Sequence, residues 1–211
     1  MKLPLLNIDG SKTSSIEVSD KIVKQKINYK LIKFVIDWQL NHSKPRTAKT
    51  KQRNQIKGST KKIVAQKGSG GARHASKKAP IFVGGGIAHG PKGKKYKVKK
   101  INKKVKKLAL AQTLSKKNYD KKLHILADVT KEIKKTKEFN QFLLKNNLAN
   151  TLIISDSDSL KNINKSARNI KNIKLIKEEG ANIYDLLKFK NVLLTSSSVK
   201  KIENRILNEK N

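Results

Sequence analysis

The sequence KGSTKKIVAQKGSGGARHASKKAPIFVGGGIAHGPKGKKYK, Lys57 to Lys97, lies at the centre of a stretch that contains no Asp or Glu. This acid-free stretch runs for 82 residues, from Trp38 to Tyr119, and carries 24 Lys and Arg. It also holds nine of the eleven glycines and three of the four histidines. Like charges held close together oppose compaction, so the stretch is expected to need a polyanion, of which nucleic acid is the commonest.

The charge is concentrated as well as high. The 211 residues carry a net charge of +35, of which the acid-free stretch contributes +24. Lys outnumbers Arg by 45 to 5, which indicates a compositional bias toward Lys. Such a bias would raise Lys everywhere, but it would not remove every carboxylate from one stretch and leave 15 elsewhere. The asymmetry therefore favours a nucleic-acid-binding protein over a bias without functional meaning.

Other classes of protein are disfavoured. The chain has no cysteine, which excludes disulfides and thiolate metal sites. No apolar run approaches the length of a membrane span, so no membrane partner is expected. The first residues, MKLPLLNIDG, reach Asp9 after a short apolar patch and resemble neither a signal peptide nor a transit peptide. A cytoplasmic location is expected.

Before the basic stretch, residues 2–6 predict a short edge strand, because Pro4 lacks the N–H group that a central strand needs. A helix is predicted from about residue 28 to residue 40 and ends before Pro45. Its apolar face is formed by Leu31, Phe34, Val35 and Trp38.

From Ser43 to about Lys95 the sequence shows neither helical nor strand periodicity. The large apolar residues there are too scattered to form a core. A segment of this length without secondary structure is unusual inside a compact domain, so we expect a partner to order it.

After the basic stretch, helical periodicity resumes near Lys99, and the chain then alternates between strands and helices. Strands are predicted at 123–127, 151–154, 173–176 and 192–195. Asp158 or Ser159 is expected to cap the helix after the second of these strands, and Ser196 to Ser198 the last helix. This rhythm predicts parallel pairing. The expected fold is α/β, a three-layer domain with a mostly parallel sheet flanked by helices. It forms one domain, 1–211, with a long basic extended loop, 43–95, inserted in it.

Two glycine-rich segments partly match the motifs of nucleotide-binding loops. Gly68 begins a GxGxxG-like run, but Arg73 stands where its last Gly or Ala belongs. Gly85 and Gly90 have the spacing of a phosphate loop, but Pro91 replaces the required Lys. Both motifs are therefore incomplete, and the glycines are better explained by close approach of the backbone to a partner.

The remaining candidates for chemistry are weak. His42, His74 and His89 have no neighbouring carboxylate or cysteine, so contact with RNA or solvent is favoured over metal binding. His124 lies in an apolar strand and is expected to be a core or edge residue. The acidic pairs Asp156/Asp158 and Glu178/Glu179 fall beside helix or strand ends, which favours capping over acid–base catalysis. No enzyme, cofactor or metal is predicted.

Four segments follow one another through the acid-free stretch: RTAKTK at 46–51, KGSGGAR at 67–73, APIFVGGG at 79–86 and NKKVKKLAL at 102–110. They resemble the bacterial-type large-ribosomal-subunit protein of the fourth universal family, specifically from about Thr47 to Leu114. The chain departs from the family pattern at Gly71, where an Arg is usual. It also departs at Ile63-Val64-Ala65, which replace a stretch with Pro, Trp and Arg.

The resemblance implies a globular domain on the outside of the large ribosomal subunit and a loop that threads through ribosomal RNA. It implies a structural role in subunit assembly, in the cytoplasm or in an organelle-encoded ribosome. The implied partners are large-subunit ribosomal RNA, neighbouring ribosomal proteins and the nascent polypeptide in the exit tunnel. An alternative is an RNA-binding regulator of its own operon, because some members of this family repress their own messenger.

The residues expected to contact ribosomal RNA are those whose side chains can neutralise phosphates or bind them through a ring nitrogen. They are Lys44, Arg46, Lys49, Lys51, Arg53, Lys57, Lys61, Lys62, Lys67, Arg73, His74, Lys77, Lys78, His89, Lys92, Lys94, Lys95, Lys103 and Lys104. The residues expected to line the tunnel form the tip of the loop: Lys67, Gly68, Ser69, Gly70, Gly71, Ala72 and Arg73.

Overall fold

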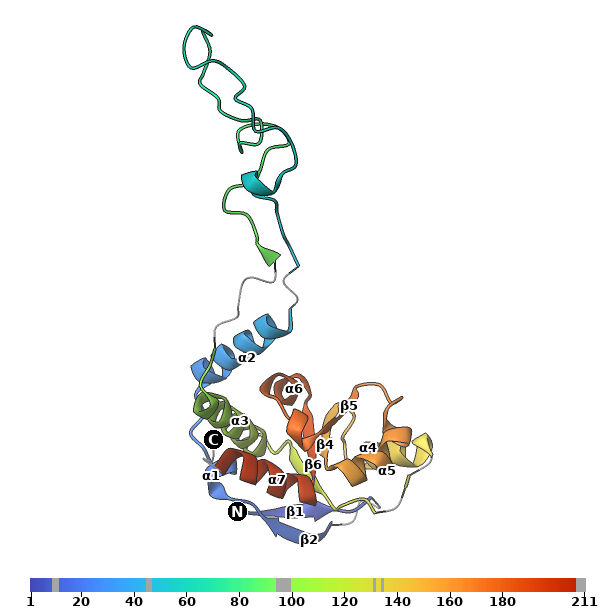
Figure 1. Cartoon of the computed structure of the whole chain (residues 1–211). Helices are drawn as coiled ribbons and strands as arrows, with labels where there is room; N and C mark the ends of the chain where they lie inside the picture. Colours follow the sequence, from blue (N-terminus) through green and yellow to red (C-terminus); the bar gives the residue numbers. More distant parts are fainter. Residues whose placement is uncertain (9–11, 45–46, 94–99, 131, 134, 208–211) are drawn as a thin grey trace. The chain divides into compact units, whose positions relative to one another are not determined.

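The computed structural model of the chain describes residues 1–8, 12–44, 47–93, 100–130, 132–133 and 135–207 (Figure 1). The chain divides into two units. The globular unit comprises Met1–Leu40 and Lys100–Asn211, and the basic loop comprises Asn41–Lys99.

The globular unit is built on one six-stranded sheet. Its strands are β1 (Lys2–Leu6), β2 (Lys12–Glu17), β3 (Leu123–Leu126), β4 (Thr151–Ser155), β5 (Ile173–Lys177) and β6 (Asn191–Thr195). They lie in the order β2-β1-β3-β6-β4-β5. Only β1 and β2 pair antiparallel, and all other neighbours are parallel. The predicted mostly parallel sheet is confirmed.

Helices cover both faces of this sheet. They are α1 (Asp20–Val23), α2 (Tyr29–Ser43), α3 (Lys103–Tyr119), α4 (Thr136–Lys145), α5 (Ser157–Ala167), α6 (Ile183–Lys188) and α7 (Ser196–Leu207). Buried residues of α1, α2, α3, α6 and α7 join one core cluster, and those of α4 and α5 join the other. Within the described part of the chain, no helix has the length and apolar character needed to cross a bilayer.

The central strands supply both clusters by alternation. Leu152 and Ile154 of β4 belong to one core cluster, whereas Ile153 between them belongs to the other. Successive side chains of a strand point to opposite faces, so a strand covered on both faces must be apolar throughout. All five residues of β4 and of β6 are buried. The predicted three-layer α/β architecture is thereby confirmed.

The prediction that residues 2–6 form an edge strand was wrong. These residues do form β1, but β2 lies outside it and forms the edge of the sheet. Pro4 is tolerated because the parallel pairing of β1 with β3 involves only Leu5 and Leu6. No strand was predicted at β2, because its sequence KTSSIE contains a single apolar residue, Ile16.

Two helix starts also differ from expectation. Asp156, rather than Asp158 or Ser159, is the N-cap of α5, and its carboxylate accepts a hydrogen bond from the backbone N–H of Asp158. At the start of α7 the acceptor is Asp128, which follows β3 and takes a 3.0 Å hydrogen bond from the backbone N–H of Ser197. Both carboxylates face a helix N-terminus, where negative charge is favoured.

Helices α2 and α3 are joined by two contacts between a lysine and an aromatic ring. The Nζ atom of Lys116 lies 4.8 Å from the ring centre of Tyr29, and that of Lys106 lies 3.6 Å from that of Trp38. Because the first residue of α2 pairs near the end of α3 and a later one pairs near its beginning, the two helices run antiparallel. Their contact therefore brings together the two places where the chain enters and leaves the basic loop.

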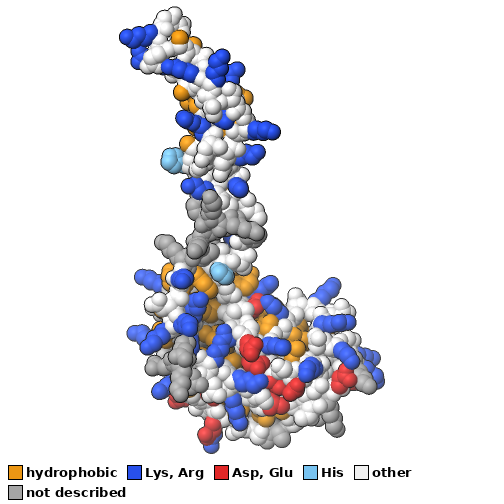
Figure 2. Space-filling view, in the orientation of Figure 1, with side chains coloured by type: hydrophobic (Ala, Val, Ile, Leu, Met, Phe, Trp, Pro, Cys, Tyr) orange, Lys and Arg blue, Asp and Glu red, His pale blue; other side chains and the backbone are white. Residues whose placement is uncertain are grey.

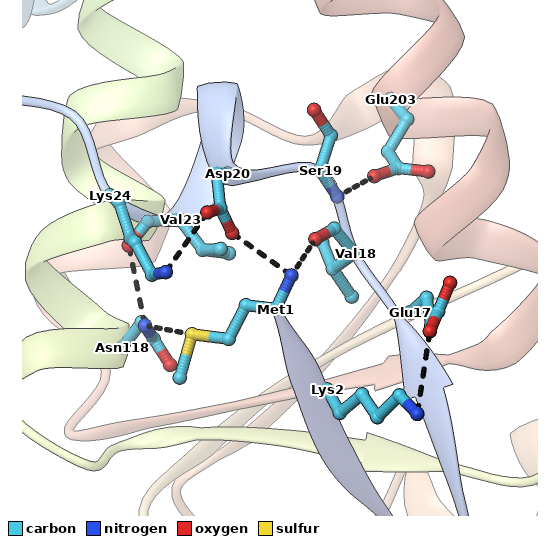
Figure 3. Close-up of polar contacts among 10 residues, drawn as sticks. All are labelled: Met1, Lys2, Glu17, Val18, Ser19, Asp20, Val23, Lys24, Asn118 and Glu203. Atoms are coloured by element: carbon cyan, nitrogen blue, oxygen red, sulfur yellow. Dashed lines mark hydrogen bonds and ion pairs between the residues drawn. The ribbon is translucent and has the colours of Figure 1, made fainter.

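Polar contacts fix the start of β1 against the start of α1, and the residue before α1 against α7 (Figure 3). The amino group of Met1 donates to the carbonyl oxygen of Val18 at 2.8 Å and to Asp20 at 2.9 Å. The pKa of the Asp20 carboxyl is held below its usual value by its hydrogen bonds with Lys24 and Met1. The backbone N–H of Ser19 donates to Glu203 of α7 at 2.6 Å.

A buried lysine joins α3 to the end of α6. Lys117 is only 6% exposed, and its ammonium donates to the carbonyl oxygens of Phe189 at 2.7 Å and Lys190 at 3.0 Å. These carbonyls follow α6, where a positive charge is favourable. Burial lowers the pKa of Lys117, and the nearby positive charge of Lys122 lowers it further.

Replacing Lys117 with Met should lower the free energy of unfolding at pH 7 by about 1–3 kcal/mol, because two carbonyl oxygens lose a charged donor. Between the lowered folded-state pKa and the ordinary value of 10.5, the unfolded chain binds more protons than the folded chain. The wild type should therefore gain stability relative to Lys117→Met as pH rises through that window. Urea unfolding at several pH values measures both effects. The exposed Lys137→Met is the control, and an equal loss in both variants would contradict the assignment.

Candidate nucleic-acid interface

The basic loop has a defined backbone although it has almost no regular secondary structure. Its described part contains one 3-10 turn, Arg53–Gln55, and one isolated β-bridge between Lys49 and Lys92. The two halves of the loop are linked by hydrogen bonds from Thr50 N to Pro91 O and from Ile87 N to Lys51 O, each 2.9 Å long. The lysines of the two halves are therefore held beside one another.

Glycines allow this close approach. A Cβ atom at Gly86 would overlap the backbone nitrogen and Cα of Arg53, and one at Gly90 would overlap the hydroxyl of Thr50. Gly86 N also donates to Lys78 O at 3.0 Å. These glycines were predicted to let the backbone come close to a partner. In the structure they also let the two halves of the loop come close to each other.

Consecutive turns shape the segment before Gly86. Ala79 N donates to Ser76 O, Phe82 N to Ala79 O and Gly85 N to Phe82 O, at 2.9 to 3.1 Å. The ring of His74 meets that of Phe82 edge-on, with centroids 5.0 Å apart. Other apolar side chains face outward, and Ile81 is 70% exposed. As predicted from their scatter, these apolar residues form no core cluster in the described part of the loop.

Five lysines line one open hollow of about 570 Å³ within the loop. They are Lys57, Lys61, Lys62, Lys77 and Lys78, and the apolar side chains of Ile56, Ile63 and Val83 complete its wall. No carboxylate lies anywhere between residues 38 and 119 of the sequence. The hollow therefore concentrates positive charge that the loop itself cannot neutralise, which is the electrostatic character of a phosphate-binding groove.

Most of the predicted RNA-binding side chains are accessible. Exposed are Lys44, Lys49, Lys51, Arg53, Lys57, Lys61, Lys62, Lys67, Arg73, Lys77, His89, Lys92, Lys103 and Lys104, whereas His74 and Lys78 are half-buried. Arg46, Lys94 and Lys95 lie outside the described residues. Figure 2 shows Lys and Arg side chains around the loop and acidic side chains on the globular unit.

All seven residues of the predicted tip, 67–73, are exposed. Gly68 and Gly70 have φ values of +85° and +67°, a region that glycine adopts without strain. A Cβ atom at Gly68, Gly70 or Gly71 would meet no heavy atom within 4 Å. Glycine at the tip is thus required by backbone conformation at two positions and by no neighbour within the chain.

A second basic hollow, also of about 570 Å³, lies on the globular unit. Lys103 and Lys104 line it, as do Lys21 of α1 and Lys107 of α3. Lys21 and Lys107 are not among the residues predicted from the sequence to contact RNA. Lys21 is far from α3 in the sequence, so no local pattern connects it with this surface. Lys107 stands beside predicted residues in the NKKVKKLAL segment and could have been included.

The acidic residues considered as candidates for acid–base catalysis include two with structural partners. Asp156 caps α5, and Glu178 accepts a 2.8 Å hydrogen bond from Lys201. His124 is half-buried in β3, and burial lowers its pKa. Among the described residues, no three His, Cys, Asp or Glu side chains lie close enough together to hold a metal ion.

Comparisons with known proteins match this chain over nearly its whole length. The model of the ribosomal protein L4/L1 family matches residues 16–205. Large ribosomal subunit protein uL4 of Pelagibacter ubique is 52% identical over 206 residues, which cover 97% of this chain and 99% of that protein. The uL4 of Desulforapulum autotrophicum is 39% identical over 95% of this chain and 96% of its own length. The uL4 of Thermotoga petrophila is 36% identical over 99% of this chain and 96% of its own length.

Gly86→Ala should separate the two halves of the loop, because its Cβ atom has no room beside Arg53. We expect the amide of Ile87, which donates to the carbonyl oxygen of Lys51, to exchange with solvent on the order of tenfold faster in this variant than in the wild type. Gly71→Ala is the matched control, since neither glycine has a positive φ and only Gly71 has open space around it. Equal exchange at Ile87 in both variants would refute the packing described above.

Proposed function

This chain belongs to the ribosomal protein L4/L1 family, and we propose that it is a structural constituent of the large ribosomal subunit that binds large-subunit ribosomal RNA. Its partners are then ribosomal RNA and the neighbouring proteins of the subunit, and its place is the ribosome. The three relatives named above are large ribosomal subunit proteins. This chain covers at least 96% of the length of each.

The observation that carries the RNA-binding proposal is the hollow with five lysines in a loop without carboxylates. In the globular unit, by contrast, basic side chains meet acids: Lys174 lies 2.6 Å from Asp185, and Lys201 lies 2.8 Å from Glu178. Lysines without internal counter-charges release bound counterions when they meet phosphates, which favours binding. RNA phosphates are the counter-charge that this loop lacks.

The backbone of the loop supports a role in assembly. Its two halves approach so closely at Gly86 and Gly90 that a Cβ atom on either glycine would overlap the facing segment. A narrow pair of chain segments with lysines on its outside fits between RNA helices and neutralises both. In this role the protein joins RNA segments and stabilises the folded subunit, and it needs no catalytic residue. We infer that it is not an enzyme.

The tip, 67–73, is proposed to line the nascent-peptide exit tunnel. It stands near the middle of the loop in sequence, and its residues are all exposed. Gly68, Gly70 and Gly71 present no side chain, while Lys67 and Arg73 place a cation on each side. Such a tip can face a passage for peptide without closing it, and its cations can pair with the surrounding phosphates.

Changing the five lysines of the loop hollow to Gln should weaken binding to large-subunit ribosomal RNA and make it less dependent on salt. If all five contact phosphates, the magnitude of the slope of log K against log salt should fall by about 3.5 to 4.5. The control removes five charges from α4, α5 and their surroundings: Lys135, Lys137, Lys145, Lys161 and Lys165. Salt-dependent binding and occupancy in salt-washed subunits measure the effect. Similar changes in both variants, or full occupancy after deletion of residues 57–95, would argue against the proposal.

A photoreactive side chain at Ser69 or Gly70 should crosslink to the nascent chain in stalled ribosomes. Lys67→Glu should shift the tip, because it places an anion beside RNA phosphates. We expect altered stalling or altered sensitivity to drugs that bind in the tunnel, with peptide-bond formation largely intact. The same photoreactive group at Lys137, on α4, is the control. Crosslinks from the tip only to proteins or RNA at the subunit surface would place it outside the tunnel.

A further inference from the structure

A hollow separate from the basic loop lies between α2, α3 and α7 on the globular unit. Its volume is about 290 Å³, near the lower end of the roughly 300–1,000 Å³ typical of small-ligand sites. Val35 of α2, Leu110 of α3 and Ile183 at the start of α6 supply apolar walls. Its size suits one planar group with a short polar extension better than a peptide or a helix.

The polar lining of this hollow is cationic or neutral, the neutral side chains being those of Gln39 and Asn182. Lys106, Lys107 and Arg205 line it, and no Asp or Glu does. Arg205 is already oriented, since one of its guanidinium nitrogens donates to the carbonyl oxygens of Glu178 at 3.1 Å and Glu179 at 2.9 Å. An oriented guanidinium and two lysines line a hollow whose lining has no carboxylate, so a ligand for it should be an anion.

The aromatic part is Trp38, which is half-buried and lines the same hollow. The ammonium of Lys106 lies 3.6 Å from the centre of its ring. An aromatic surface and a cation are therefore presented side by side. A contact between a lysine and an aromatic ring at a partly exposed site is weak, so Lys106 can turn to a phosphate when one arrives.

A second lysine–ring contact between α2 and α3 indicates that Lys106 does more than hold the two helices together. Lys116 also lies over an aromatic ring, that of Tyr29, at the other end of the α2–α3 contact. Neither Lys116 nor Tyr29 lines the hollow. If the lysine–ring contacts only held the helices together, the two pairs would be equivalent. Only the Trp38 pair stands at a hollow with two further cations.

We propose that this hollow binds one unstacked nucleotide of RNA, with its base against Trp38 and the apolar wall and its phosphate at Lys106 and Lys107. A nucleotide combines a flat aromatic group with an anion at short distance, as the lining requires, and bases freed from a helix stack on aromatic side chains. The proposal rests on the RNA binding proposed above. It adds a base-binding site on the globular unit, outside the loop.

Trp38 is the only tryptophan of the chain, so its fluorescence reports on this hollow directly. The full chain is titrated with adenosine 5′-monophosphate, with adenosine and with inorganic phosphate, and absorption by the ligand is corrected with free tryptophan. We expect saturable quenching by the mononucleotide and weaker binding of each fragment, because each lacks half of the contacts.

Lys106→Gln should weaken mononucleotide binding by about tenfold, since it removes a charge-assisted contact to phosphate. Lys116→Gln is the matched control, on the same helix and over a similar ring, and should change binding by less than about twofold. Circular dichroism and urea unfolding of both variants check that the α2–α3 contact survives. Equal weakening in the two variants, or no saturable quenching of the wild type, would overturn the proposal.

The source of the nucleotide is tested with RNA. A short single strand should quench Trp38, and the same sequence in a duplex should do so much less, because its bases are stacked and paired. Quenching by mononucleotide but not by single-stranded RNA would overturn the assignment to RNA, and competition by poly-glutamate alone would indicate a protein partner instead. Salt-dependent RNA binding through the five loop lysines is measured separately. If the hollow does not bind a nucleotide but the loop lysines still bind RNA, this inference is refuted and the proposed function is not.

Discussion

The antiparallel contact between α2 and α3 is the constraint on which the basic loop depends. The chain leaves the globular unit after α2 and returns at α3, so holding these helices together closes the loop between them. Val35 of α2 and Leu110 of α3 are buried in the same core cluster. The two lysine–ring contacts lie toward opposite ends of the contact between the two helices. Closing a loop costs entropy, which rises only slowly with its length. The packing free energy of the globular core offsets this entropy cost, so the loop needs no core of its own.

Separation of charge follows from this division. The globular unit places its carboxylates at helix ends and beside lysines, as with Asp156 at α5 and Asp185 beside Lys174. These carboxylates stabilise the fold, so its basic side chains are partly neutralised before any partner arrives. The loop has no carboxylate, and backbone hydrogen bonds and glycine contacts hold its two halves together. Its positive charge therefore has no counter-charge within the loop.

The sequence predicted the parts of the fold that depend on local pattern. The strands at 151–154 and 192–195 were recognisable because burial on both faces requires unbroken apolar runs. β2 was missed because an exposed edge strand needs only one apolar residue, Ile16. The cap by Asp128 and the packing of Gly86 on Arg53 depend on residues brought together from distant segments. The lysines of the loop could be named from charge alone, but their grouping around one hollow could not.

The two basic surfaces differ in what they can recognise. Lysines along the loop are point charges on flexible stems, and phosphate contacts position a protein on RNA without reading its sequence. The hollow at Trp38 has a rigid ring, an oriented guanidinium and apolar walls, so the nucleotide proposed for it would be held in one orientation. A loop that binds RNA by charge alone could settle in several registers. A single nucleotide held at the place where the loop begins would select one of them, and the flexible contacts would then form in a defined order from that point.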